Sequence, residues 1–347
     1  MGTVRGPENT HDPMTTFLKR ALGLGLAVST AAAGLAQQDA MFTKYMFNSL
    51  NYNPAYAGSK DFMSLGLIHR SQWLGIEGAP NSQTFTGHTP LRNERVGVGL
   101  SLANDAIGPT NTMSAQVSYA YRIPVSDGLR LSVGLQAGVE NYRADFTKVS
   151  LATEDPAFGT TPNRWLPNLG AGLFLFGERF YAGLSSPHLV EYELREPDDP
   201  NIPIYSRRYR HYYASVGAAF PVRGDDIVFK PSMLVKNVGL FSGSSKNEAA
   251  RTIGAPTEVD IDASLLFYQK FWVGASLRTA VEVINDRSSF DSADVWFSIN
   301  LNNGMRIGAA YDYPLTALNQ ASAGGFELML GYEFNFLSDR LVTPRYF

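Results

Sequence analysis

The sequence predicts an all-β protein, namely a transmembrane antiparallel up-and-down β-barrel of about 14 strands with a short N-terminal periplasmic segment. Three observations favour this fold class. Apolar and polar residues alternate with a period of two over many segments of about ten residues, the length that a tilted strand needs to cross a bilayer. After residue 36, no uncharged apolar run approaches the ~18 residues of a membrane helix. The gaps between the segments are short and long in turn, as in bacterial outer-membrane barrels.

The composition fits this fold class and argues against several others. Charged residues make up 18% of the chain, below the roughly 25% of soluble domains. The absence of cysteine excludes disulfides, thiolate metal sites, thiol catalysis and lipid attachment. A net charge of -3 provides no basic surface, so nucleic acid is not expected as a partner.

Residues 1–36 are predicted to be a start extension followed by a signal peptide. Lys19 and Arg20 form a positive region, residues 21–33 form an apolar region, and residues 34–36 provide a small-x-small cleavage site. The apolar run is too short to span a membrane. We therefore expect the chain to be exported.

Residues 37–60 are predicted to be a periplasmic, plug-like segment, because their pattern differs from the rest of the chain. Apolar side chains recur at spacings of three to five, which would place them on one helical face. Asn-Pro at 53–54 and Ala-Gly at 57–58 then supply turn residues. Two interpretations remain: a short helix that packs under or into the barrel and meets a partner, or a lead-in strand or ordered arm. The candidate partner-binding residues here are Met41, Phe42, Tyr45, Met46 and Phe47.

Residues 61–336 are predicted to form the barrel, and residues 337–347 a C-terminal periplasmic tail. In residues 129–140, for example, leucine, valine and alanine occupy the odd positions, while arginine, serine, glutamine and glutamate occupy even ones. This is the alternation of a lipid-facing and a lumen-facing side. The predicted strands are 62–74, 82–91, 95–103, 112–123, 129–142, 166–176, 179–185, 209–221, 226–236, 258–267, 270–279, 293–300, 305–313 and 325–336.

The gaps between these strands predict which ends face the periplasm. The short gaps are 92–94, 124–128, 177–178, 222–225, 268–269 and 301–304. The longest are 143–165, 186–208 and 237–257, which we expect to be external loops. A closed barrel satisfies every backbone group in lipid. Aromatic residues near strand ends are expected either in interfacial girdles or as ordinary core residues: Tyr119, Tyr121, Tyr142, Tyr311 and Tyr313.

The loop 186–208 carries many charges, of which Glu191, Glu193, Arg207 and Arg208 are candidate partner-binding residues. Such a loop could bind a protein partner, a divalent ion or lipopolysaccharide, or it could simply be solvated. Polar residues within strands, among them His88, His211, Asp260 and Asp262, are expected to line the lumen.

The histidines provide no recognisable catalytic set. None of them belongs to a Gly-x-Ser-x-Gly elbow or a His-Glu-x-x-His site, and the sequence contains no P-loop. We expect a protein that is not an enzyme, and we assign no catalytic, cofactor-binding or metal-binding residue and no cofactor.

Three stretches of the chain resemble the PorP/SprF family. The first is FTKYMFNSLNYNPAYAGS at 42–59, and the second is FELMLGYEFNF at 326–336 with TPRYF at 343–347. The third comprises HRSQW at 69–73 and PNSQT at 80–84, similar to the first hairpin of the family. The resemblance is collinear over nearly the whole mature chain, except in the loops 143–165 and 237–257.

The resemblance implies an integral outer-membrane component of the type IX secretion system of a Gram-negative bacterium, which in some bacteria also supports gliding motility. It implies three kinds of partner besides outer-membrane lipid: secreted proteins with a C-terminal secretion domain, a periplasmic peptidoglycan-binding protein, and the periplasmic ring of the machine.

We therefore expect an adaptor or anchor that links secreted cargo at the cell surface to periplasmic machinery. A barrel of 14 strands has room for side chains and a plug, but hardly for a folded protein in transit. The alternative is a passive porin or a fatty-acid-type transporter, since such barrels share the strand pattern. A soluble secreted β-protein is a third interpretation, which the strand lengths disfavour.

Overall fold

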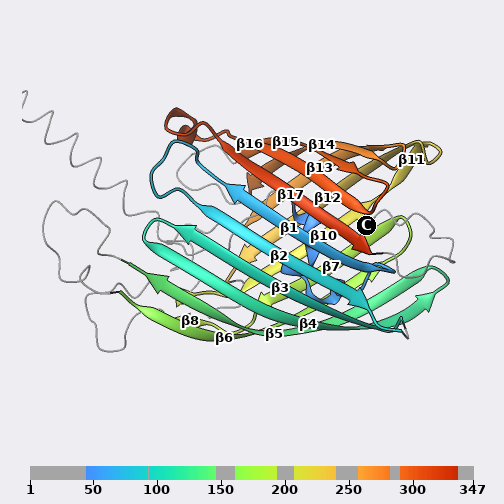
Figure 1. Cartoon of the computed structure of the whole chain (residues 1–347), viewed down its shortest axis with the longest axis horizontal. Helices are drawn as coiled ribbons and strands as arrows, with labels where there is room; N and C mark the ends of the chain where they lie inside the picture. The colour runs from blue at the N-terminus through green and yellow to red at the C-terminus, as the bar shows by residue number, and fades with distance from the viewer. Residues whose placement is uncertain are drawn as a thin grey trace, which may run out of the picture.

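The structure, a computed structural model, describes residues 44–92, 94–145, 161–193, 207–239, 257–281 and 290–334. The predicted signal peptide and C-terminal tail lie outside the described residues. The described residues form a closed antiparallel β-barrel, as the sequence predicted (Figure 1). None of their helices is long and apolar enough to cross a membrane.

The barrel wall contains fourteen strand crossings, matching the predicted number. β10 and β11 lie on either side of Ala219 and both pair with β12, so together they make one crossing. The strands of the wall are β1 (Met63–Ser71), β2 (Asn81–Pro90), β3 (Val96–Ile107), β4 (Thr110–Ser126), β5 (Leu129–Ala144), β6 (Asn163–Phe176), β7 (Phe180–His188), β10 (His211–Ala218), β11 (Phe220–Arg223), β12 (Ile227–Val238), β13 (Glu258–Phe267), β14 (Phe271–Ala280), β15 (Phe290–Asn300), β16 (Met305–Pro314) and β17 (Gly325–Phe334).

The first and last strands close the ring. β1 pairs with β17 along its whole length, from Met63 opposite Phe334 to Ser71 opposite Phe326, and the two lie side by side in Figure 1. On the other side, β10 joins β7 to β12. Because the sheet has no open edge, its backbone groups pair within the protein, as the interior of a bilayer demands.

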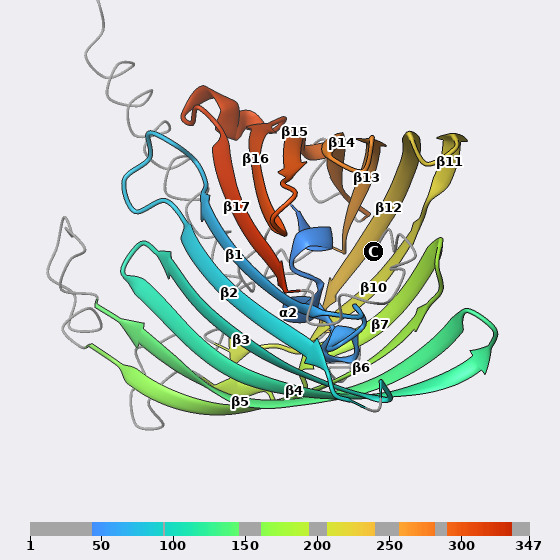
Figure 2. The ribbon, with the colours of Figure 1, turned by 45° about the vertical axis from the view of Figure 1, so that its right-hand side comes forward.

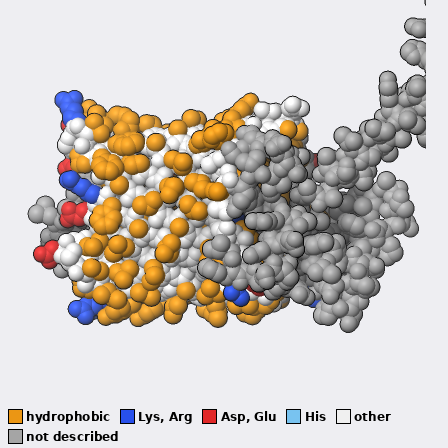
Figure 3. Space-filling view, turned by 180° about the vertical axis from the view of Figure 1, so that it is seen from behind, with side chains coloured by type: hydrophobic (Ala, Val, Ile, Leu, Met, Phe, Trp, Pro, Cys, Tyr) orange, Lys and Arg blue, Asp and Glu red, His pale blue; other side chains and the backbone are white. Residues whose placement is uncertain are grey.

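Side chains alternate between an apolar outer face and a largely polar lumen. On β5, Ser132, Gln136 and Glu140 are buried, while Leu135 between them is 61% exposed. In Figure 3 the outer face is covered with apolar side chains, and charged side chains gather at one rim. An apolar belt bounded by charge is the surface that a bilayer covers.

Four of the tyrosines expected either in girdles or in the core are exposed on the outer face, which is compatible with a girdle: Tyr119, Tyr121, Tyr311 and Tyr313. Tyr142 is instead a core residue, the second alternative, because it is buried and packs with Ala144 and Leu166. The reason is the strand period, since Tyr142 shares the inward face of β5 with Glu140.

The connections differ in length at the two ends of the barrel. At the short-turn end, the links are 91–95, 127–128, 177–179, 224–226, 268–270 and 301–304. At the long-loop end, the links are longer, except that Gly108–Pro109 alone joins β3 to β4. The sequence predicted a longer gap there, but these two strands extend beyond their predicted ends. The long-loop end also carries a small hairpin, β8 (Tyr192–Glu193) with β9 (Arg207–Arg208), and the turn η6 (Ala317–Gln320).

Residues 44–60, which we call the plug, lie inside the barrel (Figure 2). They form three short helical pieces: η2 (Tyr45–Phe47), α2 (Ser49–Tyr52) and η3 (Pro54–Tyr56). Of the residues predicted to share one helical face, Tyr45 and Met46 lie in η2, and Met41 and Phe42 lie outside the described residues. The helical pieces are separated at Asn48 and again at Asn53, which caps η3 through its side chain ahead of Pro54. The plug and the inward side chains of the wall together form the core.

Candidate functional site

The plug is held at its start by a buried cation. Lys44 is fully buried, donates to Ser276 and Asp294, and lies 3.6 Å from Asp262. Ser276 lies on β14, Asp294 on β15 and Asp262 on β13, so one lysine joins the plug to three strands. Asp262 also accepts hydrogen bonds from Ser276 and from Trp296 Nε1, the latter at 2.8 Å. Removing one partner from such a buried cluster is costly, because the others stay desolvated.

Aromatic residues then pack the plug against the wall. The ring of Phe47 lies 5.1 Å from that of Trp272 and 5.3 Å from that of Trp296. Tyr45 donates from its hydroxyl to Ser232 at 2.7 Å. Burial raises the pKa of Tyr45 well above its ordinary value, so the hydroxyl stays protonated as a donor.

The middle of the plug fits against small residues of the wall. Asn53 donates from Nδ2 to the carbonyl of Leu173 at 2.9 Å. A Cβ atom added at Gly134 would overlap the backbone of Ala55, and one added at Gly97 would overlap that of Ala57. The glycines at these positions therefore permit the backbone of the plug to approach the sheet closely.

The end of the plug is tied to the last strands. Lys60 lies 2.8 Å from Glu333, and the same carboxylate accepts from Arg306 at 3.0 Å. His88 accepts from the Gly58 backbone N–H at 3.2 Å. The prediction that His88 and Asp262 line the lumen is confirmed, and the plug is what they contact.

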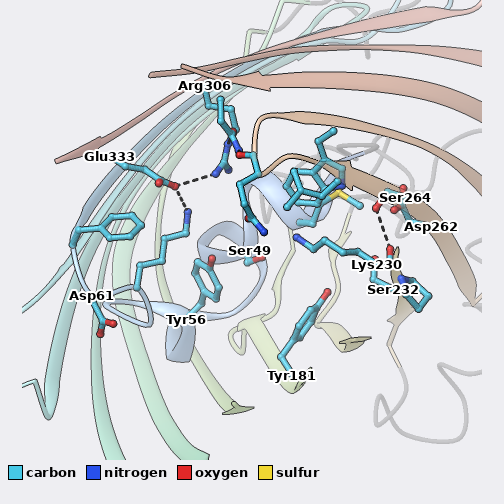
Figure 4. A pocket seen from close by; sticks show the side chains of 18 of the residues that line it. Ser49, Tyr56, Asp61, Tyr181, Lys230, Ser232, Asp262, Ser264, Arg306 and Glu333 are labelled. Carbon is cyan, nitrogen blue, oxygen red and sulfur yellow. Dashed lines mark hydrogen bonds and ion pairs between the residues drawn. The ribbon is translucent and has the colours of Figure 1, made fainter. Parts of the chain in front are cut away.

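A cavity of about 240 Å³ lies between the plug and the wall toward the short-turn end (Figure 4). Arg306 and Glu333 lie on one side of it, and Lys230, Ser232 and Asp262 on the other. Its lining extends to the exposed residues Gln269 and Asp61. It therefore reaches the rim of the barrel.

The charged loop of the long-loop end folds back onto the wall. Arg208 forms an ion pair with Glu140, which is 2% exposed on the inward face of β5. Arg208 also lies 3.3 Å from His188, and Arg210 lies 3.8 Å from Glu191. These charges hold the loop hairpin to the mouth of the barrel.

The predicted partner-binding residues fall into two groups in the structure. In the plug, Tyr45 is buried and Met46 and Phe47 are half-buried in the lumen, whereas Met41 and Phe42 lie outside the described residues. At the long-loop end, Glu191 and Arg208 engage in the ion pairs above. For Glu193 and Arg207 only the backbone is described, and it pairs them across the β8–β9 hairpin. Partner binding by any of them stays a prediction.

We expect Arg208→Met to loosen the loop hairpin, because the Glu140 carboxylate would stay buried without its cation. The expected result is faster limited proteolysis of the loop between β7 and β10 in intact cells, with an unchanged barrel. Glu140→Gln in the same chain should restore part of the protection. Equal cleavage rates for Arg208→Met and the parent would contradict the role of this ion pair.

The closed barrel, the apolar belt and the filled lumen define an integral outer-membrane β-barrel protein of a Gram-negative bacterium. The sequence profile of one family, described as "Type IX secretion system membrane protein PorP/SprF", matches residues 34–332. The chain belongs to this family, which confirms the resemblance that the sequence motifs showed.

Solved structures of other barrels are also similar to the chain. Omp33 of Acinetobacter baumannii has a TM-score of 0.43 at 12% identity, covering 79% of this chain and 100% of that one. The KdgM porin has a TM-score of 0.36 at 9% identity, covering 78% and 99%. BamA from Haemophilus ducreyi lacking POTRA domains 1–3 has a TM-score of 0.40 at 10% identity, covering 79% and 71%. None of the curated proteins compared with the sequence matches it.

In its family and its barrel fold, the chain resembles outer-membrane proteins that are not enzymes. Among the described residues, no three His, Asp or Glu side chains converge in a way that could hold a metal ion.

Proposed function

We propose that this protein is an adaptor in the outer-membrane part of the type IX secretion system. It would link secreted proteins that carry a C-terminal secretion domain to the periplasmic ring and to a peptidoglycan-binding protein, and in some bacteria support gliding. The family makes the chain a component of that system. One observation carries the adaptor role: the plug crosses the lumen and is anchored at both of its ends, by the buried ion pairs of Lys44 at its start and by the buried Gly58–His88 hydrogen bond and the partly exposed Lys60–Glu333 pair at its end.

The plug also restricts the route that cargo can take. A fixed plug with a buried lysine and packed aromatics leaves no path for a folded protein through a barrel of this size. Cargo would then be held outside, at the long-loop end, while the short-turn end faces the periplasm. The proposal includes export by the signal peptide predicted at residues 14–36 and the absence of catalysis.

A reciprocal pull-down tests the adaptor role. Proteins crosslinked to the barrel in intact cells would be captured from three strains: the parent, a deletion of residues 195–205, and a deletion of residues 41–47. The loop deletion should lose secreted proteins and keep periplasmic ones, and the deletion of 41–47 should do the reverse. Heat-modifiable mobility in gels checks that each barrel folds.

The porin alternative makes a different prediction for the purified parent. A passive porin would show steady single-channel conductance in planar bilayers, whereas the plugged adaptor should show none. Steady conductance together with unchanged capture in both deletions would replace the adaptor proposal with the transporter.

A further inference from the structure

Another cavity, of about 250 Å³, lies at the long-loop end of the barrel, opposite to the cavity described above. The loop between β1 and β2 and the loop between β16 and β17 form one side of it, and they lie next to each other (Figure 1). The adjoining ends of β1, β13, β14, β15 and β16 form the rest. None of its described lining residues belongs to the plug. The adaptor role therefore does not use this cavity.

Trp73 lies at the edge of this cavity with its side chain 37% exposed. Its backbone has a φ of 50°, in the left-handed region that a bulky residue rarely adopts. The next residue fixes this conformation, because the Leu74 N–H donates to Gly324 at 2.8 Å and the Leu74 carbonyl accepts from Ala323 at 2.9 Å. A tryptophan held in this way offers a flat apolar face to a ligand at little cost in conformational entropy.

Two polar atoms of the lining meet no partner among the residues that the structure describes: the hydroxyl oxygen of Ser292 and the Oδ1 atom of Asp312. Ser292 is 5% exposed on β15, and Asp312 lies on the neighbouring strand β16. A buried polar group without a partner costs free energy, which a hydrogen bond to a ligand would recover. Arg278 adds donors, because its bonds to Asp260 use two of its five N–H groups.

The charges of the lining favour a neutral ligand. Four of its five charged side chains already form ion pairs: Arg70 with Asp312 at 2.8 Å, Arg278 with Asp260 at 2.6 Å, and Glu258 with Lys236 at 3.8 Å. The fifth, Asp291, is exposed, so water screens its charge. Hydroxyl groups suit such a lining, because each can donate to a carboxylate and accept from a guanidinium.

The size and the apolar part of the cavity restrict the rest of that ligand. A dry cavity of about 150 Å³ accepts benzene, so about 250 Å³ accommodates a six-membered ring with its substituents. Pro314 and Leu318 extend the apolar surface that Trp73 begins. A pyranose ring has an apolar C–H face that packs on an indole, and hydroxyl groups around its edge that both donate and accept.

We propose that this cavity binds a neutral hexopyranose, with one face of the ring on Trp73 and with hydroxyl groups bonded to Ser292 and Asp312. The hexopyranose is either a free monosaccharide or one unit of a glycan chain. The site is independent of the adaptor role, because it rests on the wall and on the loops at the long-loop end alone.

Ligand-observed NMR titration of the purified barrel, in a detergent without a sugar head group, tests the site. The probes are the methyl pyranosides of glucose, galactose, mannose and N-acetylglucosamine, and cyclohexylmethanol is the control ring. At least one pyranoside should bind saturably, and cyclohexylmethanol at least roughly tenfold more weakly, because it has no ring hydroxyl groups. A methyl disaccharide of the sugar that binds then distinguishes the sources. Tighter binding of the disaccharide would assign the site to a glycan chain, and equal or weaker binding to a free sugar.

Two cavity variants and one matched control locate the binding. Trp73→Gly removes the indole and keeps a residue that adopts the left-handed backbone without strain. Ser292→Ala removes the hydroxyl group that has no partner. Each should weaken binding roughly fivefold or more. Ser298→Ala removes another buried hydroxyl without a partner from the same strand, outside the lining, and should leave binding unchanged.

Four results would overturn the proposal. They are the absence of saturable binding by every pyranoside, equal affinity for cyclohexylmethanol, tighter binding of cationic glucosamine than of N-acetylglucosamine, and unchanged affinity in both cavity variants. Heat-modifiable mobility confirms that each variant folds.

Discussion

Replacing Lys44 by methionine is expected to destabilise the barrel by roughly 3–5 kcal/mol, the cost of breaking a buried ion pair by removing one partner. Lys44 is fully buried, and its ammonium faces Asp294 and Asp262. Methionine fills a similar volume but leaves both carboxylates desolvated. Asp262 keeps its hydrogen bonds from Ser276 and Trp296, so Asp294 bears most of the loss. Urea titration of the folded fraction in lipid vesicles, followed by gel mobility, measures the change.

Two matched variants separate charge from packing. Lys44→Met combined with Asp294→Asn should recover most of the lost stability, because the amide no longer carries a buried charge. Lys60→Met should cost only about 1 kcal/mol, because this pair is partly solvated and Glu333 keeps Arg306. A Lys44→Met barrel as stable as the parent would refute the anchoring role.

The strands of the barrel wall could be predicted from the sequence because the alternation of side chains along a strand depends on that strand alone. A period of two places Leu135 outside and Gln136 inside whatever the neighbouring strands are, and the rule holds for β5 along most of its length. The count of fourteen crossings followed from the same alternation. The same parity decides between the two alternatives left for Tyr142, because it shares the inward face of β5 with Glu140.

The interior of the barrel could not be predicted in the same way. Lys44 is the one charged residue in MFTKYMF, and Asp294 lies on the polar face of a predicted strand, so the sequence shows each of them separately. They are 250 residues apart, and only closure of the ring brings them together. The short helical pieces of the plug do have a local cause, since Asn48 and the Asn53–Pro54 pair divide it into single turns.

A disulfide between the plug and the wall is expected to stabilise the barrel by up to roughly 4 kcal/mol, the value for closing a loop of about 40 residues. The variant is Ala57→Cys with Gly99→Cys. A Cβ atom built at Gly99 lies 3.4 Å from the Ala57 Cβ, near the range of about 3.5–4.5 Å found in disulfides. The chain has no other cysteine, so the bond has no competitor. Urea titration of the oxidised and the reduced protein measures the gain, and each single cysteine variant should show no redox dependence.

The same variant determines whether the plug is a fixed part of the core or a gate. A Cβ at Gly99 also approaches Leu50, but this strain is present in both redox states and cancels in the comparison. If the buried ion pairs of Lys44 and the partly exposed pair of Lys60 keep the plug in place, both redox states should show no conductance in planar bilayers. Discrete openings in the reduced protein that vanish on oxidation would show a plug that leaves the lumen. That result would exclude a permanently closed adaptor.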